Sequence, residues 1–210
     1  MLHQLPYDHK IQPAPPAVQE ERHLRHQAIP VPSGLATLGL CRDENSAFGW
    51  DNEFERHVVE VPAFEIDECK TTNGQFLDFI KAGGYRDRGL WTEDGWQWKE
   101  QVGIEHPGFW KRHGAGFRHR GMFDDEAWRG DSPVFVSHAE ARAYAVWRGR
   151  RLPTEAEWHR YAGSNTVADG WEWTSTLFAP FAGFRPFAFY AGYSAEFFDG
   201  QHYVLKGGSA

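Results

Sequence analysis

Hydrophobic and polar positions alternate along two segments in the first third of the chain. The segments are GLATLGLC, residues 34–41, and HVVEVPAFEID, residues 57–67. Both hold apolar and β-branched residues in an order close to period two, which is typical of strands. Another strand is predicted near the C-terminus in HYVLKGG, residues 202–208. The two early segments predict an antiparallel start to the fold.

Helical periodicity follows three capping boxes, in which a Thr or Ser and a Gln or Glu three residues later satisfy each other's backbone donors. The boxes are Thr72 with Gln75, Ser137 with Glu140, and Thr154 with Glu157. Amphipathic helices are predicted in NGQFLDFIKA (73–82) and HAEARAYAVWRG (138–149), and a third helix from Thr154 to Ala162. Their inward faces are predicted to hold Phe76, Phe79 and Ile80 in the first helix and Ala141, Tyr144, Ala145 and Trp147 in the second.

Two aromatic segments show no helical period. WTEDGWQWKE, residues 91–100, is predicted to form a hairpin with Asp94-Gly95 at its turn. Its three tryptophans form a binding platform if they are exposed and part of the scaffold if they are packed. After residue 170 helical signals end, and FAPFAGFRPFAFYAGYSAEFF, residues 178–198, is predicted to be an aromatic loop. The elements together predict an α+β fold with two to three short helices and long aromatic loops.

Composition indicates one substantial domain that is rich in loops. The 210 residues include ten Trp, sixteen Phe and twenty-two Gly, and aromatic side chains among glycines indicate long connections held by packing. Six of the twelve prolines fall within residues 6–32, which predicts a linker. The stretch before it, MLHQL, resembles the last turn of a helix ended by Pro6. We expect the end of a helical-bundle domain plus a Pro-rich linker in residues 1–32, and the main domain in residues 33–210.

Charge and cysteine usage exclude several classes of protein. The net charge is −7 and Lys and Arg form no stripe, which argues against nucleic acid as a partner. Only Cys41 and Cys69 are present, so there is no cysteine framework and a reducing compartment fits best. No apolar run reaches the roughly 18 residues that a membrane helix needs, and MLHQLPYDHK does not resemble a signal peptide. We expect a cytoplasmic protein with no membrane partner.

Six sequence blocks occur in the same order as in a known superfamily. The blocks are FGWDNEFERHVVEVPAFEID, TTNGQFLDFI, SPVFVSHAEARAYAVWRGRRLPTEAEWHRYA, GWEWTST, FAPFAGFRP and YSAEFFDGQHYVLKGGS. On these blocks, over about residues 33–209, the sequence resembles the sulfatase-modifying-factor superfamily, whose prototype is the formylglycine-generating enzyme. The resemblance is strongest to the C-terminal domain of ergothioneine-biosynthesis sulfoxide synthases. It implies a C-type-lectin-like fold with a twisted antiparallel sheet, two helices and long structured loops.

The resemblance also implies a non-haem iron reaction in full-length relatives. Sulfoxide synthases use dioxygen to join a small thiol, γ-glutamylcysteine or cysteine, to the imidazole of trimethylhistidine. Three histidines of an N-terminal helical-bundle domain hold the Fe(II), two of them in an H-x-x-x-H-x-E helix. This sequence contains no such motif. We therefore expect no iron ligands in this chain and no cofactor other than calcium, which stays open. We expect the two substrates as partners only if a helical-bundle iron domain is supplied.

Histidines elsewhere in the chain are poor substitutes for those ligands. His23 and His26 lie in a polar, proline-flanked stretch, and His113 and His119 in a loop rich in Gly and Arg. Each pair lacks a third ligand and defined surroundings, so solvated surface histidines are the favoured interpretation. The same interpretation applies to His3, His9 and His57.

Three features predict a shortened family member. One is the missing iron motif, and another is the absence, after KGGSA, of an Asn-Trp-Asp segment that helps relatives bind substrate. The third is that TEAEW and WEWTST are separated only by HRYAGSNTVADG, where the family has several tens of residues. A turn at Gly163-Ser164-Asn165 can close this gap, but a strand-and-loop layer is expected to be missing. We expect that this chain does not catalyse alone.

Four residues are carried over from the family as candidate site residues. An active-site tyrosine of the aromatic loop donates a proton in the sulfoxide synthases, and its best match is Tyr190, with Tyr193 as the alternative. A phenol suits this role because it is protonated at pH 7, and aromatic packing is the alternative interpretation. Asp169 and Glu172 resemble a position that binds calcium in some members, with Asp169 where Asn is usual. The alternative for Glu172 is a buried carboxylate bonded to loop amides.

The charged RRLPTEAEW block is assigned to structure rather than to chemistry. Glu155 and Glu157 lie in a first helical turn, where carboxylates favour the helix dipole and cap backbone donors. Arg150 and Arg151 can pair with them or with loop carbonyls. Formylglycine-generating activity is not expected, because it relies on cysteines near the C-terminus and no cysteine follows Cys69.

Three classes of function stay open. The chain is a substrate-binding domain of an ergothioneine-type sulfoxide synthase, a non-catalytic lectin-like binding module, or a remnant with no function of its own. The first interpretation is favoured for ancestry, and it requires an iron domain from a longer protein or another chain. The third is favoured for what this chain does alone, and the second is a more distant alternative.

Overall fold

The computed structural model describes residues 5–10, 27–42, 48–163 and 170–208. The chain forms two compact units, which are described separately. Unit 1 consists of Met1–Arg25 and Cys69–Arg150, and unit 2 of His26–Glu68 and Arg151–Ala210. The boundary predicted after residue 32 stays a prediction, and MLHQL lies mostly outside the described residues. No helix in the described ranges is long and apolar enough to cross a membrane.

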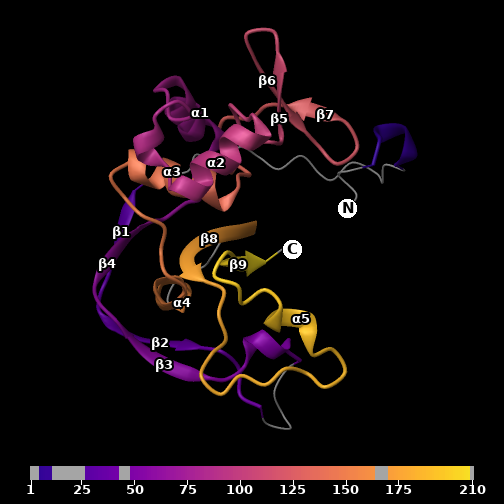
Figure 1. Ribbon diagram of the computed structural model, residues 1–210. Coiled ribbons are helices and arrows are strands. Elements are labelled where there is room, and N and C mark those ends of the chain that lie inside the picture. The colour runs from indigo at the N-terminus through magenta and orange to yellow at the C-terminus, as the bar shows by residue number, and fades with distance from the viewer. Residues whose placement is uncertain (1–4, 11–26, 43–47, 164–169, 209–210) are drawn as a thin grey trace, which may run out of the picture. The chain divides into compact units, whose positions relative to one another are not determined.

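The described residues of unit 1 form three α-helices and a three-stranded antiparallel sheet (Figure 1). The elements are α1 (Asn73–Lys81), α2 (Glu93–Val102), β5 (Trp110–His113), β6 (Gly116–Arg120), β7 (Asp125–Ala127) and α3 (His138–Trp147). The strands pair in the order β5-β6-β7, with Trp110 opposite His119 and Arg118 opposite Ala127.

Aromatic side chains make up most of the core of unit 1. The Phe76 ring stacks on Tyr144 at 5.4 Å between centroids and meets Phe79 edge-on at 5.2 Å. Such pairs add roughly 0.5–1.5 kcal/mol each beyond the area they bury. The fully buried members of this core are Phe76, Phe79, Tyr85, Trp91, Trp110, Ala143 and Tyr144. Packing in this core therefore explains part of the aromatic-rich composition.

The capping boxes predicted for α1 and α3 are confirmed. The Thr72 hydroxyl accepts from the Gln75 N–H at 3.4 Å, and the Ser137 hydroxyl accepts from the Glu140 N–H at 3.3 Å. Glu140 also accepts a hydrogen bond from the buried Tyr85 hydroxyl. Burial, together with the negative charge of Glu140, raises the pKa of Tyr85 far above its usual range. The buried face of α3 differs slightly from the prediction, because its fully buried apolar residues are Ala143, Tyr144 and Ala145, whereas Ala141 is half-buried.

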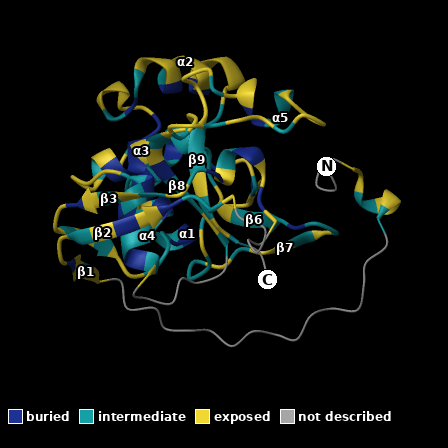
Figure 2. Ribbon diagram, turned by 90° about the horizontal axis from the view of Figure 1, so that it is seen from below, coloured by how far each residue is buried: buried dark blue, intermediate teal, exposed yellow. Residues whose placement is uncertain are grey.

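The hairpin predicted for residues 91–100 is wrong, because the segment is helix α2. The Thr92 hydroxyl accepts from the Gly95 N–H at 3.1 Å, so Asp94-Gly95 lies in a first helical turn and not in a β-turn. The acids of this turn suit the positive end of the helix dipole. Most of α2 is exposed (Figure 2). Trp91 is buried in the core, with its indole N–H 2.8 Å from the Gly84 carbonyl oxygen, so this tryptophan belongs to the scaffold.

Unit 2 begins with a long antiparallel ribbon. The alternating pattern predicted its strands within residues 34–67, whereas its first strand lies in the segment predicted to be a linker. Strand β1 (Ala28–Val31) pairs with β4 (Phe64–Asp67), and β2 (Gly34–Leu38) pairs with β3 (His57–Val61). Val31 lies opposite Phe64 and Gly34 opposite Val61, so two residues on each side separate the two ladders and the register continues across the break. Figure 1 shows the four strands along one curved ribbon.

Helix α4 (Glu155–Ala162) covers the β2-β3 part of this ribbon. Ala156 and Phe181 pack against the buried side chains of Ala36, Leu38 and Val61. Strands β8 (Gly170–Leu177) and β9 (Tyr203–Gly208) form a second antiparallel pair, with an irregularity between Trp173 and Leu177. The turn predicted at Gly163-Ser164-Asn165 lies largely outside the described residues.

The α+β class is confirmed, but the helix count is higher than predicted. The described residues hold five α-helices, against the two to three expected. One addition is α2, and another is α5 (Gly192–Ala195), a single turn within the segment predicted to be an aromatic loop. A four-residue turn is too short to produce a helical period in the sequence.

The Arg151–Glu157 ion pair makes stability depend on pH. Two guanidinium nitrogens of Arg151 lie 2.8 and 2.6 Å from the Glu157 carboxylate oxygens, and these bonds hold the pKa of Glu157 below its usual range. A lowered folded-state pKa stabilises above the unfolded value of about 4.3, and the stabilisation is lost as pH falls through the folded value. We expect Arg151→Gln to cost about 0.5–1 kcal/mol at pH 7, since Arg151 is largely exposed, and clearly less near pH 3.

Urea unfolding at both pH values checks this expectation, with Arg142→Gln on an exposed position of α3 as the control. An equal loss at pH 7 and pH 3 would show that the Arg151 side chain stabilises by packing instead of by charge.

Candidate functional site

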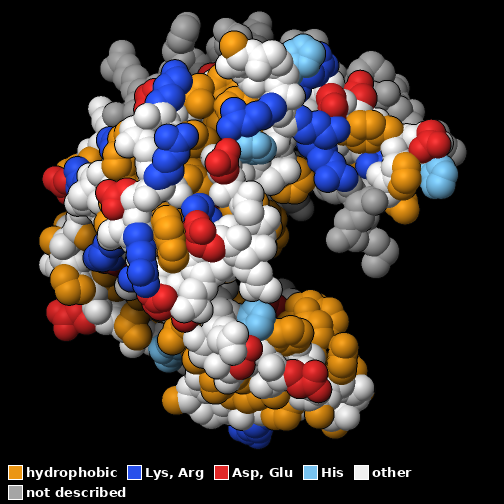
Figure 3. Space-filling view, turned by 45° about the horizontal axis from the view of Figure 1, so that its top comes forward, with side chains coloured by type: hydrophobic (Ala, Val, Ile, Leu, Met, Phe, Trp, Pro, Cys, Tyr) orange, Lys and Arg blue, Asp and Glu red, His pale blue; other side chains and the backbone are white. Residues whose placement is uncertain are grey.

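The aromatic loop of unit 2 presents exposed rings. We call Phe48, Trp50, Phe189, Tyr190 and Tyr193 the aromatic surface. Trp50 stacks on Tyr193 at 4.1 Å between ring centroids, and the Phe48 ring meets Trp50 edge-on at 5.2 Å. Hydrophobic side chains gather at the bottom of the space-filling view (Figure 3). Exposed apolar patches of this kind mark sites of interaction.

A buried hydrogen bond between Ser194 and Asp51 connects the two segments that carry the aromatic surface. The Ser194 hydroxyl of α5 donates to the Asp51 carboxylate at 2.5 Å, and both residues are almost completely inaccessible to solvent. This bond ties the loop after β8 to the turn Asp51–Glu53, which follows Trp50. The positions of Trp50 and Tyr193 therefore depend on a bond between residues far apart in the sequence.

The two candidate tyrosines lie side by side on this surface. Tyr190 and Tyr193 have ring centroids 5.4 Å apart in an edge-on arrangement. Tyr190 is 56% exposed, whereas Tyr193 is partly covered by its stack with Trp50. An accessible phenol can reach a substrate, so the geometry favours Tyr190 over Tyr193 for proton donation. The catalytic role of either residue stays a prediction.

Glu172 is engaged in a contact between helix and strand. Its carboxylate accepts a hydrogen bond from the Trp158 indole N–H at 2.6 Å, which links β8 to α4. Its predicted calcium partner Asp169 lies outside the described residues. Calcium binding by this pair stays a prediction.

The histidines that the structure describes do not fit an iron site. Nowhere in the described ranges do three His, Cys, Asp or Glu side chains converge as metal ligands would. His113 lies opposite Gly116 and His119 opposite Trp110, so this pair occupies different rungs of the β5-β6 ladder. His57 bonds to the Glu55 backbone oxygen, and His9 lies on the exposed turn Tyr7–His9. His3, His23 and His26 lie outside the described residues.

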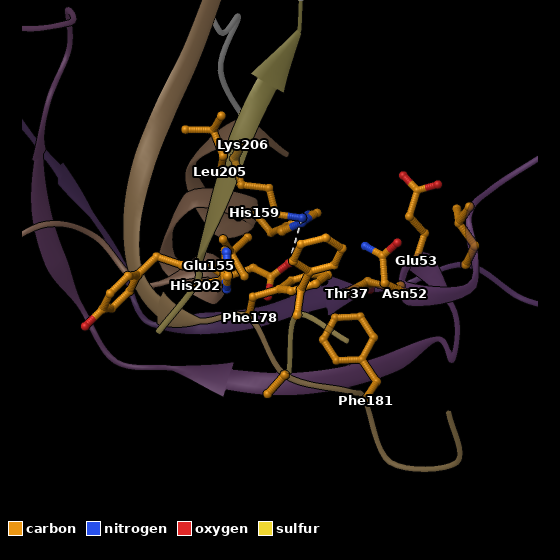
Figure 4. Close-up of a pocket in the computed structure, with 16 residues that line it drawn as sticks. Thr37, Asn52, Glu53, Glu155, His159, Phe178, Phe181, His202, Leu205 and Lys206 are labelled. Atoms are coloured by element: carbon orange, nitrogen blue, oxygen red, sulfur yellow. Dashed lines mark ion pairs between the residues drawn. The ribbon is translucent and has the colours of Figure 1, made fainter. Parts of the chain in front are cut away.

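A cavity of about 470 Å³ opens in unit 2, between the end of β2, helix α4, the loop after β8 and strand β9 (Figure 4). Ligand pockets commonly measure about 300–1,000 Å³. One wall is aromatic, with Phe178, Phe181 and Phe197, and the other carries polar groups from α4 and β9. This volume and this combination of aromatic and polar walls are typical of a small-molecule site.

The polar wall combines an ion pair with a buried imidazole. The Lys206 ammonium lies 2.6 Å from the Glu155 carboxylate, as the dashed line in Figure 4 shows. His159 follows Glu155 by one helical turn, so both line the cavity from the same face of α4. Its Nε2 atom is buried and has no hydrogen-bond partner in the part of the chain that the structure describes. Burial, followed by the charge of Lys206, lowers the pKa of His159, so the ring is neutral at pH 7.

Sequence reasoning missed this cavity. It assigned Glu155 to a helix start, which is correct for the backbone, but its carboxylate pairs with Lys206 of a distant strand. His159 and Lys206 carried no signal of their own in the sequence. The position of His159 four residues after Glu155 is the one local sign that could have joined two of the three residues.

The sequence matches hercynine oxygenases, an ergothioneine biosynthesis protein and formylglycine-generating enzymes. It is 36% identical over 207 residues to the hercynine oxygenase of Mycobacterium tuberculosis, a match that covers 76% of this chain and 48% of that protein. It is 28% identical over 223 residues to ergothioneine biosynthesis protein 1 of Schizosaccharomyces pombe, covering 89% of this chain and 27% of the relative. It is 31% identical over 172 residues to the formylglycine-generating enzyme of M. tuberculosis, covering 68% and 53%.

The lengths of these matches show how much of each relative the chain covers. The chain spans about half the length of the hercynine oxygenase that it matches. The aligned stretch of 207 residues also exceeds the 76% of 210 residues that it covers here. The relative therefore holds some tens of residues inside the match that have no counterpart in this chain. A shortened segment between TEAEW and WEWTST would account for them, and its location stays a prediction.

A family match covers most of the chain. Residues 14–170 match the sulfatase-modifying factor enzyme 1-like domain. This span includes the ribbon of unit 2, the aromatic core of unit 1 and helix α4, so the match rests on both units. The chain therefore belongs to the family of sulfatase-modifying factor enzyme 1-like domains.

Proposed function

We propose that this chain is the substrate-binding domain of an ergothioneine-type sulfoxide synthase, with a C-type-lectin-like arrangement of its elements. The enzyme would join γ-glutamylcysteine or cysteine to trimethylhistidine with dioxygen. The observation that carries the proposal is the 36% identity to a hercynine oxygenase over 207 residues. The second ergothioneine protein, from S. pombe, supports the same pathway.

The aromatic surface suits the proposed cationic substrate. Aromatic faces attract quaternary ammonium groups, at roughly 0.5–2 kcal/mol for each contact. The stacked pair of Trp50 and Tyr193 and the exposed Tyr190 ring offer such faces. In this proposal the rings hold the trimethylammonium group, and the Tyr190 hydroxyl donates a proton during the reaction.

Iron would have to be held by histidines that are not among the described residues. The proposal assigns the metal to a helical-bundle domain, either in a longer protein or in another chain. When bound, iron would supply the activation of dioxygen. The residues of this chain would bind and orient the substrates and exclude water from them.

Reconstitution tests the proposal. The chain is mixed with, or fused in frame to, the helical-bundle half of the M. tuberculosis hercynine oxygenase. Fe(II), dioxygen, trimethylhistidine and γ-glutamylcysteine are added, and mass spectrometry follows the sulfoxide product. We expect product from the combined halves and none from either half alone. If the fused protein is folded and loaded with iron but neither binds trimethylhistidine nor forms product, the non-catalytic binding module replaces this proposal.

The reconstituted protein also separates the two tyrosines. We expect Tyr190→Phe to slow product formation at least tenfold with little change in apparent substrate affinity, because the variant keeps the ring and loses only the proton. Tyr193→Phe is the matched control, since it retains the stack on Trp50. A larger loss from Tyr193→Phe would transfer the proton-donor role to Tyr193.

A further inference from the structure

The cavity of unit 2 holds a pair of opposite charges in a sheltered place. The Glu155 side chain is 8% exposed and the Lys206 side chain 24%. Electrostatic attraction is stronger in such surroundings than in water. An ammonium group has three N–H donors, and the contact with Glu155 requires one of them. Lys206 can therefore serve a second acceptor while it stays paired.

His159 gives the cavity a second donor beside Lys206. A neutral imidazole donates from one ring nitrogen and accepts at the other. The buried Nε2 atom lacks a partner among the described residues, and such an unpaired group destabilises the site until an acceptor binds to it. Lys206 and His159 together suit one carboxylate, and Glu155 suits a positively charged donor next to it.

The remaining walls are suited to an apolar group. Phe178 and Phe181, which follow β8, lie in the cavity wall (Figure 4), and Phe197 from the segment before β9 also lines the cavity. Stacking and burial against these rings favour a flat or branched hydrocarbon side chain. Asn52 and Glu53 also line the cavity, but the Glu53 carboxylate already accepts the Trp50 backbone N–H at 2.6 Å.

We propose that this cavity binds a free α-amino acid with an apolar side chain. The carboxylate of the amino acid would accept from Lys206 and His159, its ammonium group would donate to Glu155, and its side chain would lie against the phenylalanine rings. A ligand with both charges matches the pair that lines the cavity and leaves the net charge of the site unchanged. The proposal does not rest on the proposed function, because no residue of the aromatic surface lines the cavity.

Three compounds that share a phenyl ring and differ in their charged groups test which charges the cavity recognises. Isothermal titration of the whole chain at pH 7.5 compares L-phenylalanine, 3-phenylpropionate and phenethylamine. We expect saturable binding of L-phenylalanine and at least tenfold weaker binding of the other two. Equal binding of the acid or of the amine would overturn the assignment of a zwitterion. The absence of saturable L-phenylalanine binding up to about 10 mM would overturn the site itself.

Variants place the binding in the cavity. His159→Phe keeps the Glu155–Lys206 pair and removes the unpartnered nitrogen, and we expect at least tenfold weaker L-phenylalanine binding without a lower melting temperature. Lys206→Met should abolish binding, with Lys81→Met on an exposed position of α1 as its control. Because Lys206→Met leaves Glu155 unpaired, His159→Phe decides the outcome if the other variant does not fold. Unchanged binding by folded His159→Phe would contradict the proposal.

Discussion

Replacing Phe79 by alanine is expected to lower the free energy of unfolding of unit 1 by about 3–5 kcal/mol. The Phe79 side chain is completely buried, and its ring packs against Phe76, Tyr144 and Trp147 at centroid distances of 5.2, 5.8 and 5.6 Å. Gly84 also lies against the ring, so closely that a Cβ atom at this position would lie 2.0 Å from it. The packing leaves the neighbours little freedom to fill the space that the ring vacates. Domains of this size are stable by only about 5–15 kcal/mol, so much of the stability would be lost.

Chemical denaturation followed by circular dichroism measures this loss. Phe135→Ala is the matched control, because Phe135 also belongs to unit 1 but is 58% exposed. The control is expected to cost no more than about 1 kcal/mol. If the two substitutions cost the same, the aromatic cluster around α1 is not the core of unit 1.

Replacing Gly207 by alanine is expected to destabilise unit 2 by about 3 kcal/mol or more. Gly207 has a φ of +129°, a backbone conformation that residues with a side chain rarely adopt. A Cβ atom there would also lie 2.1 Å from the Gly170 carbonyl oxygen on the neighbouring strand. Because that neighbour is backbone, relief requires β8 and β9 to separate. The β9 strand also carries Lys206, so ligand binding in the cavity should fall together with stability.

Gly208→Ala provides the comparison for Gly207. Gly208 lies in the same strand, has no positive φ and would place a Cβ atom in open space. We expect a change within about 0.5 kcal/mol. Thermal unfolding of the two variants checks the difference, and equal melting temperatures would show that the β8-β9 pairing at this end does not contribute to stability.

Local sequence signals predicted the helices that begin with a reciprocal cap. The boxes at Thr72, Ser137 and Thr154 contain all the information that a helix start needs within four residues. Thr92 caps α2 in the same way, but Gly95 cannot return the bond from a side chain, and Asp-Gly is also a common turn signal. Helix and hairpin bury Trp91 and Trp96 differently, and which of them is favoured depends on the tertiary structure.

The candidate sites also differ in whether local sequence signals could predict them. The family blocks gave Tyr190 and Tyr193 as candidate site residues, because both lie in one short segment of the sequence. The cavity depends on Glu155 meeting Lys206, and the support of the aromatic surface depends on Asp51 meeting Ser194, pairs 51 and 143 residues apart. No periodicity or propensity relates residues at such separations, so neither contact could be predicted from one sequence.

The order of the two units along the chain has a consequence for synthesis on the ribosome. Residues 69–150 of unit 1 interrupt unit 2, whose first part precedes them and whose last part, residues 151–210, follows. The described core residues of unit 1 all lie within the interruption. Since chains grow from the N-terminus and domains fold as units, the middle of this protein can fold while the β1–β4 ribbon still waits for α4 and the strands β8 and β9. During that interval the apolar side chains of β2 and β3 are exposed to solvent, and the nascent chain is open to aggregation there.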